Sequence, residues 1–246
     1  MTDISFVIPV YNEADILARQ LESIRQFVPA EFDRQVIVVD NGSTDNSVQV
    51  AQEGGADIVL EQSGTVAALR NAGASHATGE VIIFIDADVL LTDAWRDHII
   101  AALEALKSGP MTITGSTVSV PPDGNWIERS WFASKQELQR NYINTGHLVV
   151  TRASFDALGG FREELVSGED YDFSMRARQQ GYRLHDNKQL RVIHHGYPTS
   201  LLQFARRERW HGEGDYQGWR AFTGSKIAIA SQLCLAAVFT STGMAL

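Results

Sequence analysis

Residues 81–88 read Val-Ile-Ile-Phe-Ile-Asp-Ala-Asp, a continuous apolar run that stops at two aspartates. The run predicts a strand, and in extended backbone residues two apart project to the same face. Adjacent carboxylates repel each other unless a cation offsets their charge. Asp86 and Asp88 therefore indicate a site for a hard divalent metal such as Mg²⁺ or Mn²⁺. The alternative is a solvated turn, in which aspartate is also favoured.

Apolar, β-rich runs alternate with helical patterns on the N-terminal side of this stretch. Strands are expected over residues 4–10, 35–39 and 56–60, and helices over 17–28, from about 41–45 onward, over 65–76 and over 93–107. This alternation predicts an α/β fold with a mostly parallel central sheet flanked by helices. From residue 111 onward, shorter strands and a helix over 170–180 predict a second half with a smaller, mixed sheet.

Composition excludes several functional classes. The 246-residue chain has a formal net charge of −9, which argues against non-specific nucleic-acid binding because that requires a basic surface. A phosphate-bearing ligand must therefore meet local basic residues or a metal. The single cysteine, Cys234, excludes an internal disulfide and a Cys-rich metal site. No secretory leader precedes the first strand, which favours a cytoplasmic location.

Polar residues also follow the first two predicted strands. Residues 9–13 read Pro-Val-Tyr-Asn-Glu, and residues 38–43 read Val-Val-Asp-Asn-Gly-Ser. Open parallel sheets bind ligands at these strand ends, so Asp40 is a candidate acceptor for a nucleoside base or ribose. Asn12 and Ser43 are equally well explained as helix caps. Arg70, on the helix before the aspartate pair, is a candidate for diphosphate binding, although an isolated helical arginine is usually a solvated surface residue.

In this order, the motifs resemble the family 2 glycosyltransferases, which have the GT-A fold, over roughly residues 5–211. The family's Pro-Val-Tyr-Asn-Glu, Val-Val-Asp-x-Gly-Ser-x-Asp, Arg-Asn-x-Gly and Asp-x-Asp segments all have counterparts here. The resemblance implies transfer of a sugar from a nucleoside diphosphate to an acceptor hydroxyl, with inversion and with Mn²⁺ or Mg²⁺. It implies a nucleotide site formed by Pro9, Tyr11, Glu13, Asp40, Arg70 and Asp86. It also implies Asp88 as the direct metal ligand.

The second half carries motifs similar to the family's acceptor half. They are Asn-Thr-Gly-His at 144–147, Leu-Gly-Gly-Phe at 158–161 and Gly-Glu-Asp at 168–170. By the resemblance, this acidic pair is catalytic and its aspartate is the general base, so Asp170 is preferred to Glu169. A carboxylate at a helix N-terminus is held by amide donors before the substrate arrives, which suits this role. The alternative is a pair of acids that only stabilise the helix dipole.

Two histidines, His194 and His195, follow the apolar run 190–193. The resemblance implies that one of them completes the metal shell, and imidazole suits manganese better than magnesium. The alternative is a structural histidine at a strand end.

A basic segment at 206–210 partly resembles the Gln-Arg-x-Arg-Trp segment of processive members such as cellulose and chitin synthases. Arg206 replaces the glutamine, and the family's long multi-span membrane region is absent, so processivity is not expected. Arg206 and Arg209 are candidates to contact the diphosphate or an anionic acceptor, and Trp210 to stack on a sugar ring.

We expect one domain over residues 1–224, with a nucleotide-binding half at 1–110 and an acceptor half at 111–224. An apolar helix is expected over 225–246. Residues 227–246 carry no charge and follow basic residues, which favours peripheral contact with the cytoplasmic face of a membrane and a lipid-linked acceptor. Interspersed serines and threonines dilute this apolarity, so a helix packed on the domain, with a sugar or small-molecule acceptor, is the alternative.

Two rival classes were weighed against this interpretation. A dinucleotide-dependent oxidoreductase is disfavoured because the first strand lacks a glycine-rich phosphate loop. A non-catalytic module that binds a sugar nucleotide would keep the same fold and binding residues. The presence of both Asp88 and Asp170 favours an enzyme over such a module.

Overall fold

The computed structural model describes residues 3–109, 111–126, 128–129, 141–198, 200 and 202–203. The chain divides into two compact units, Met1–Tyr197 and Pro198–Leu246, and every element discussed below lies in the first. The boundary expected at residue 224 and the segment 225–246 lie outside the described residues, so the domain limits stay a prediction. Within the described part of the chain, no helix is both long and apolar enough to cross a bilayer.

Seven strands form the central sheet, in the order β3-β2-β1-β4-β7-β6-β8. Their bounds are β1 (Ile4–Val10), β2 (Arg34–Asp40), β3 (Ile58–Glu61), β4 (Val81–Ile85), β6 (Thr112–Gly115), β7 (His147–Thr151) and β8 (Arg183–Asp186). All neighbouring strands are parallel except that β7 runs antiparallel to both β4 and β6. The predicted α/β fold with a mostly parallel sheet is confirmed. Strands of the second half extend this same sheet, and a small antiparallel sheet pairs β5 (Val89–Leu91) with β9 (Val192–His194).

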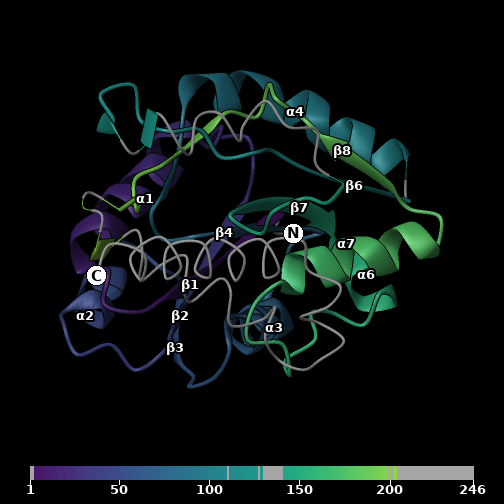
Figure 1. Cartoon of the computed structure of the whole chain (residues 1–246). Helices are drawn as coiled ribbons and strands as arrows, with labels where there is room; N and C mark the ends of the chain where they lie inside the picture. The colour runs from purple at the N-terminus through teal and green to yellow at the C-terminus, as the bar shows by residue number, and fades with distance from the viewer. Residues whose placement is uncertain are drawn as a thin grey trace, which may run out of the picture. The chain divides into compact units, whose positions relative to one another are not determined.

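Helices cover both faces of the central sheet (Figure 1). One face carries α1 (Ala14–Phe27) and α4 (Asp93–Ser108), with α2 (Ser47–Glu53) packed beside α1, and the other carries α3 (Val66–His76), α6 (Arg152–Ala157) and α7 (Glu169–Gln179). The strands serve both layers because successive side chains point to opposite faces. In β1, Phe6 packs toward α1 and α4, while Val7 packs toward α3. The apolar stripe predicted on α1 is confirmed by its buried Leu17 and Leu21.

Most predicted elements begin and end close to their expected positions. The exception is α2, which was expected to start at about residues 41–45 but starts at Ser47. The residues between β2 and α2 form a loop whose polar groups bind the neighbouring loop after β1. This places two polar loops side by side at the carboxyl ends of β1 and β2.

Candidate active site

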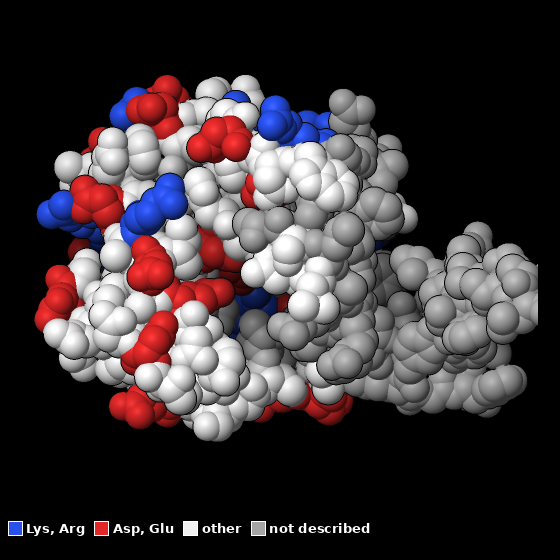
Figure 2. Space-filling view, turned by 60° about the vertical axis from the view of Figure 1, so that its left-hand side comes forward, with Lys and Arg blue, Asp and Glu red and all other residues white. Residues whose placement is uncertain are grey.

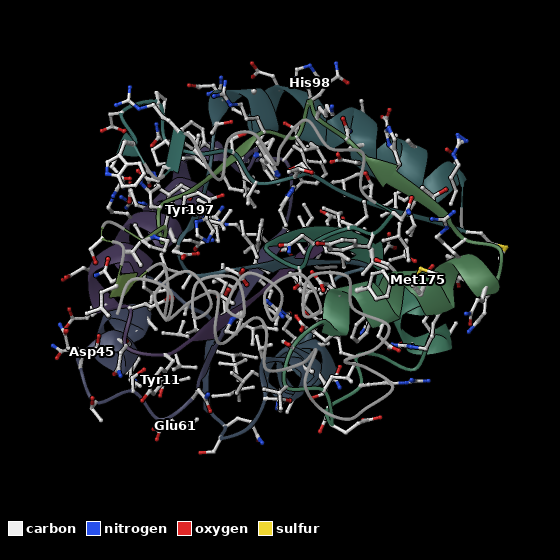
Figure 3. The ribbon with its side chains drawn as sticks, viewed as in Figure 1. Tyr11, Asp45, Glu61, His98, Met175 and Tyr197 are labelled. Atoms are coloured by element: carbon white, nitrogen blue, oxygen red, sulfur yellow. The ribbon has the colours of Figure 1, made fainter. Side chains whose placement is uncertain are left out.

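Side-chain hydrogen bonds join the loops that follow β1 and β2. The backbone N–H of Asn12 donates to Ser43 Oγ at 2.9 Å, and Asn12 Oδ1 accepts from the backbone N–H of Thr44 at 2.7 Å. Asn12 has φ 55°, in the left-handed region that asparagine tolerates better than most residues. Neither Asn12 nor Ser43 caps the helix that follows it. Figure 3 shows Tyr11 and Asp45, one from each loop, at the same end of the sheet.

The predicted nucleotide residues of the first two strands lie at this end. Asp40 is 1 % exposed, and its Oδ2 accepts from the backbone N–H groups of Gly42 and Ser43 at 2.9 and 2.8 Å. Its Oδ1 is buried and has no hydrogen-bond partner within the described part of the chain. Buried polar atoms are nearly always paired, so this oxygen points to a missing ligand donor. Pro9 is buried in β1, whereas Tyr11 is 57 % exposed beyond it.

An acidic cluster lies where β1 and β4 end. Burial, together with the negative charges of Asp88, Asp86 and Asp45, raises the pKa of Glu13 to about 8. Figure 2 shows acidic side chains gathered beside a hollow of this face, with a basic side chain visible inside it. Such a concentration of carboxylates favours the binding of a cation.

Asp86 and Asp88 lie in a turn, so the extended-backbone argument for their convergence is wrong. The strand ends at Ile85, and the backbone N–H of Val89 donates to the Asp86 carbonyl at 3.0 Å. As a result the two carboxylates contact different partners. Asp86 pairs with Arg70, and Asp88 pairs with His194.

Arg70 connects the two halves of the site. Its side chain is almost fully buried, with Nη1 2.5 Å from Glu169 Oε1 and Nη2 2.6 Å from Asp86 Oδ1. Burial alone would lower the pKa of Arg70, but Asp86 and Glu169 outweigh it and the pKa is raised. Both Nη atoms thus engage carboxylates, and the predicted diphosphate contact stays a prediction.

The candidate metal ligands lie at the end of the small sheet, where Asp88 precedes β5 and His194 ends β9. Asp88 Oδ2 lies 3.3 Å from His194 Nε2, and the His194 ring packs on Tyr197. A Cβ added to Gly196 would lie 1.7 Å from Asp88 Oδ2, so a side chain there would occupy the space of the carboxylate. His195 donates its backbone N–H to the Asp88 carbonyl at 2.8 Å, and its ring lies in a partly buried site where burial lowers its pKa.

A carboxylate beside an imidazole fits Mn²⁺ in the chemistry of its donors. Within the described residues, no group of three His, Cys, Asp or Glu side chains is placed to hold a metal ion. Asp88 and His194 are the predicted metal ligands that the structure brings together, and their role in metal binding stays a prediction.

The candidate base lies at the start of α7, as predicted. Asp170 Oδ1 accepts from the backbone N–H of Tyr171 at 2.7 Å, and its Oδ2 accepts from Asn144 Nδ2 at 3.0 Å. Burial, with a smaller contribution from the charge of Glu169, raises the pKa of Asp170 to about 6. Glu169 is buried and accepts from Arg70 and from Thr145 Oγ1.

The sequence assigned no role to Asn144 or Thr145, although their Asn-Thr-Gly-His segment was recognised as a motif. In the structure, Asn144 donates to Asp170 and Thr145 donates to Glu169. The remaining candidates, Arg206, Arg209 and Trp210, lie outside the described residues.

Comparison with known proteins gives a family and a fold. The model of the family described as "Glycosyl transferase family 2" matches residues 5–160. Glycosyltransferase AglE of Haloferax volcanii is 27% identical over 229 residues, covering 88% of this chain and 74% of that protein. A pre-mycofactocin glycosyltransferase of Mycobacterium tuberculosis is 27% identical over 227 residues, but this chain spans only 46% of its length. The mannosyltransferase PcManGT from Pyrobaculum calidifontis, solved with GDP-Man and Mn²⁺, has a TM-score of 0.63 at 21% identity. The match covers 98% of this chain and 79% of the PcManGT chain.

Proposed function

Because this chain belongs to the family 2 glycosyltransferases and has their GT-A fold, we propose that it transfers a sugar from a nucleoside diphosphate to an acceptor hydroxyl with inversion. The observation that carries the proposal is the placement of Asp170. Its carboxylate is held at a helix N-terminus, one residue from the glutamate that Arg70 ties to Asp86. The candidate base therefore lies next to the residue whose ion pair with Arg70 joins the two halves of the site.

The protonation state of Asp170 suits a general base. With a pKa of about 6, the carboxylate is mostly ionised at pH 7 yet basic enough to accept a proton. We expect the acceptor oxygen to attack the anomeric carbon as its proton moves to Asp170. The bond from that carbon to the diphosphate oxygen breaks in the same displacement, and the nucleoside diphosphate departs. Since the reaction is one displacement, the configuration inverts and no nucleophilic side chain is required.

The donor would bind along the carboxyl ends of β1, β2 and β4. Asp40 Oδ1 would accept from the base or ribose, beside Pro9, Tyr11 and Glu13. Asp88 and His194 would hold Mn²⁺ or Mg²⁺, and the Mn²⁺ in the PcManGT complex supports manganese. When bound, such an ion stabilises the negative charge that develops on the departing diphosphate.

The acceptor side is proposed in outline. An acceptor that is a sugar, a lipid-linked group or a small molecule would approach Asp170 from the second half of the chain. Arg206, Arg209 and Trp210 are its proposed contacts, and the segment 225–246 is the proposed contact with the cytoplasmic face of a membrane. A cytoplasmic location belongs to the same proposal.

Thermal unfolding with UDP, GDP, dTDP and CDP, each with and without Mn²⁺, tests the donor site. A nucleotide at 100 times its Kd should stabilise the folded state by about 2.7 kcal/mol. We expect one nucleotide to raise the Tm in a manganese-dependent way. Asp40→Asn should lose this shift, because an amide NH₂ would replace the unpaired acceptor, while Glu61→Gln at the same sheet end should keep it. Absence of a shift with all four nucleotides would contradict the proposal.

A further inference from the structure

A series of contacts holds the segment 142–145 against the first turns of α7. Thr145 Oγ1 donates to Glu169 at 3.1 Å, Asn144 Nδ2 donates to Asp170 at 3.0 Å, the backbone N–H of Ile143 donates to Ser174 Oγ at 3.1 Å, and the rings of Tyr142 and Tyr171 meet edge to face with centroids 5.8 Å apart. The segment thus runs along the helix that carries the base, with one contact for each residue. Asn144 is the member whose side chain touches Asp170.

The orientation of the Asn144 amide follows from its other hydrogen bond. The backbone N–H of Gly146 donates to Asn144 Oδ1 at 2.7 Å. Because a backbone N–H can only donate, the atom it meets must be the amide oxygen. The NH₂ group is therefore the one that faces Asp170, and it can only donate to the carboxylate.

The charges around Asp170 make this donor important. Glu169 on the same helix and Asp86 after β4 both carry like charge, and Arg70 on α3 carries the opposing charge. The two Nη atoms of Arg70 lie on Glu169 and Asp86. Direct hydrogen bonds to Asp170 come instead from the Tyr171 backbone on one oxygen and from Asn144 on the other.

We propose that Asn144 is a positioning residue for the general base, which fixes the orientation of the Asp170 carboxylate and favours its ionised form. The inference rests on the proposed function, in which Asp170 accepts the proton of the acceptor. Hydrogen bonding to the charged form of an acid lowers its pKa, so Asn144 opposes the effects of burial and of Glu169. Without this donor the carboxylate would hold its proton to higher pH, and of the two hydrogen bonds described above it would keep the one from the Tyr171 N–H.

Asn144→Asp is the sharpest variant, because its shape is unchanged. The aspartate still offers an oxygen to the N–H of Gly146, but it places a second carboxylate oxygen against Asp170. Asn144→Ala removes both bonds. Asn141→Ala is the matched control, since Asn141 is exposed just before the segment and its backbone carbonyl, not its side chain, accepts from Arg178.

The readout is the pH dependence of kcat/KM for nucleoside diphosphate release, with GDP-Man and UDP-GlcNAc as the donors tried and Mn²⁺ present. Losing a hydrogen bond to a charged group should move the acidic limb of Asn144→Ala upward by about one pH unit. Asn144→Asp should move it further, and Asn141→Ala should leave it in place. A ¹³C NMR titration of the Asp170 carboxyl, assigned with Asp170→Asn, should show the same shift without any substrate.

An acidic limb and a carboxyl titration that coincide with wild type in both Asn144 variants would overturn the inference. Loss of folding in both variants would also overturn it, because Asn144 would then be structural. Failure of the proposed function looks different. In that case Asp170→Asn itself would remain active, whatever the Asn144 variants do.

Discussion

Replacing Arg70 by methionine should destabilise the protein strongly, because it leaves a buried carboxylate without its cation. Glu169 is buried on the acceptor half, whereas the Asp86 side chain is 34 % exposed and can be solvated. Removing one partner of a buried ion pair costs about 3–5 kcal/mol. Because Asp86 is partly exposed, we expect the lower end of this range, a free energy of unfolding reduced by about 3 kcal/mol. For a unit of this size that corresponds to a Tm about 6–12 °C lower.

Urea unfolding followed by tryptophan fluorescence, with a parallel thermal scan, measures this loss. Arg96→Met is the matched control, because Arg96 pairs with Asp93 and Asp97 on the surface of α4, where such pairs contribute at most about 1 kcal/mol. The double variant Arg70→Met with Glu169→Gln should recover most of the loss, since it removes the orphaned charge while Thr145 keeps an acceptor. Equal losses in the Arg70 and Arg96 variants, or no recovery in the double variant, would refute the reasoning.

Three further predictions concern the candidate metal ligand Asp88, the pH dependence of activity and the membrane role of residues 225–246. Asp88→Ala should remain folded but lose metal-dependent turnover, measured as nucleoside diphosphate release with and without Mn²⁺; full activity would remove Asp88 from the metal site. The activity of the wild type should rise with pH through about 6, because Asp170 acts in its deprotonated form and its pKa is about 6; a flat profile between pH 5 and 7 would contradict this. In liposome co-sedimentation with anionic lipid, the full chain should partition to the pellet more than a chain ending at Gly224; equal partitioning would remove the membrane role of 225–246.

Local sequence patterns predicted most elements of the first half of the fold, but β5 and α6 were not predicted. The strands β1 and β4 have the predicted bounds, because each is a continuous apolar run that ends at polar residues. The start of α2 was predicted too early. The polar residues before it do not join the helix but form hydrogen bonds with the loop that contains Asn12. Contacts of that kind join segments about 30 residues apart and leave no local periodicity.

In the site, local sequence indicated some candidate residues but not the partners that they contact. Residue types at a strand end were enough to nominate Asp86 and Asp88, whereas Asp170 was nominated through the resemblance to the family. The partners of Arg70 lie 16 and 99 residues away in the chain, so no spacing rule could pair them. Pairing of β5 with β9 is what brings His194 to Asp88, and adjacent histidines cannot be told apart before that register is known.

The most direct test of the account is the transfer rate of Asp170→Asn. This variant keeps the size of the side chain and leaves Asp40, Asp88 and His194 in place, so nucleotide and Mn²⁺ should raise its Tm by the amount expected for wild type. Without a carboxylate to accept the acceptor's proton, the rate of nucleoside diphosphate release with an acceptor should fall by about 10² or more. A folded Asp170→Asn enzyme that transfers at a near wild-type rate would contradict the assignment of Asp170 as the general base.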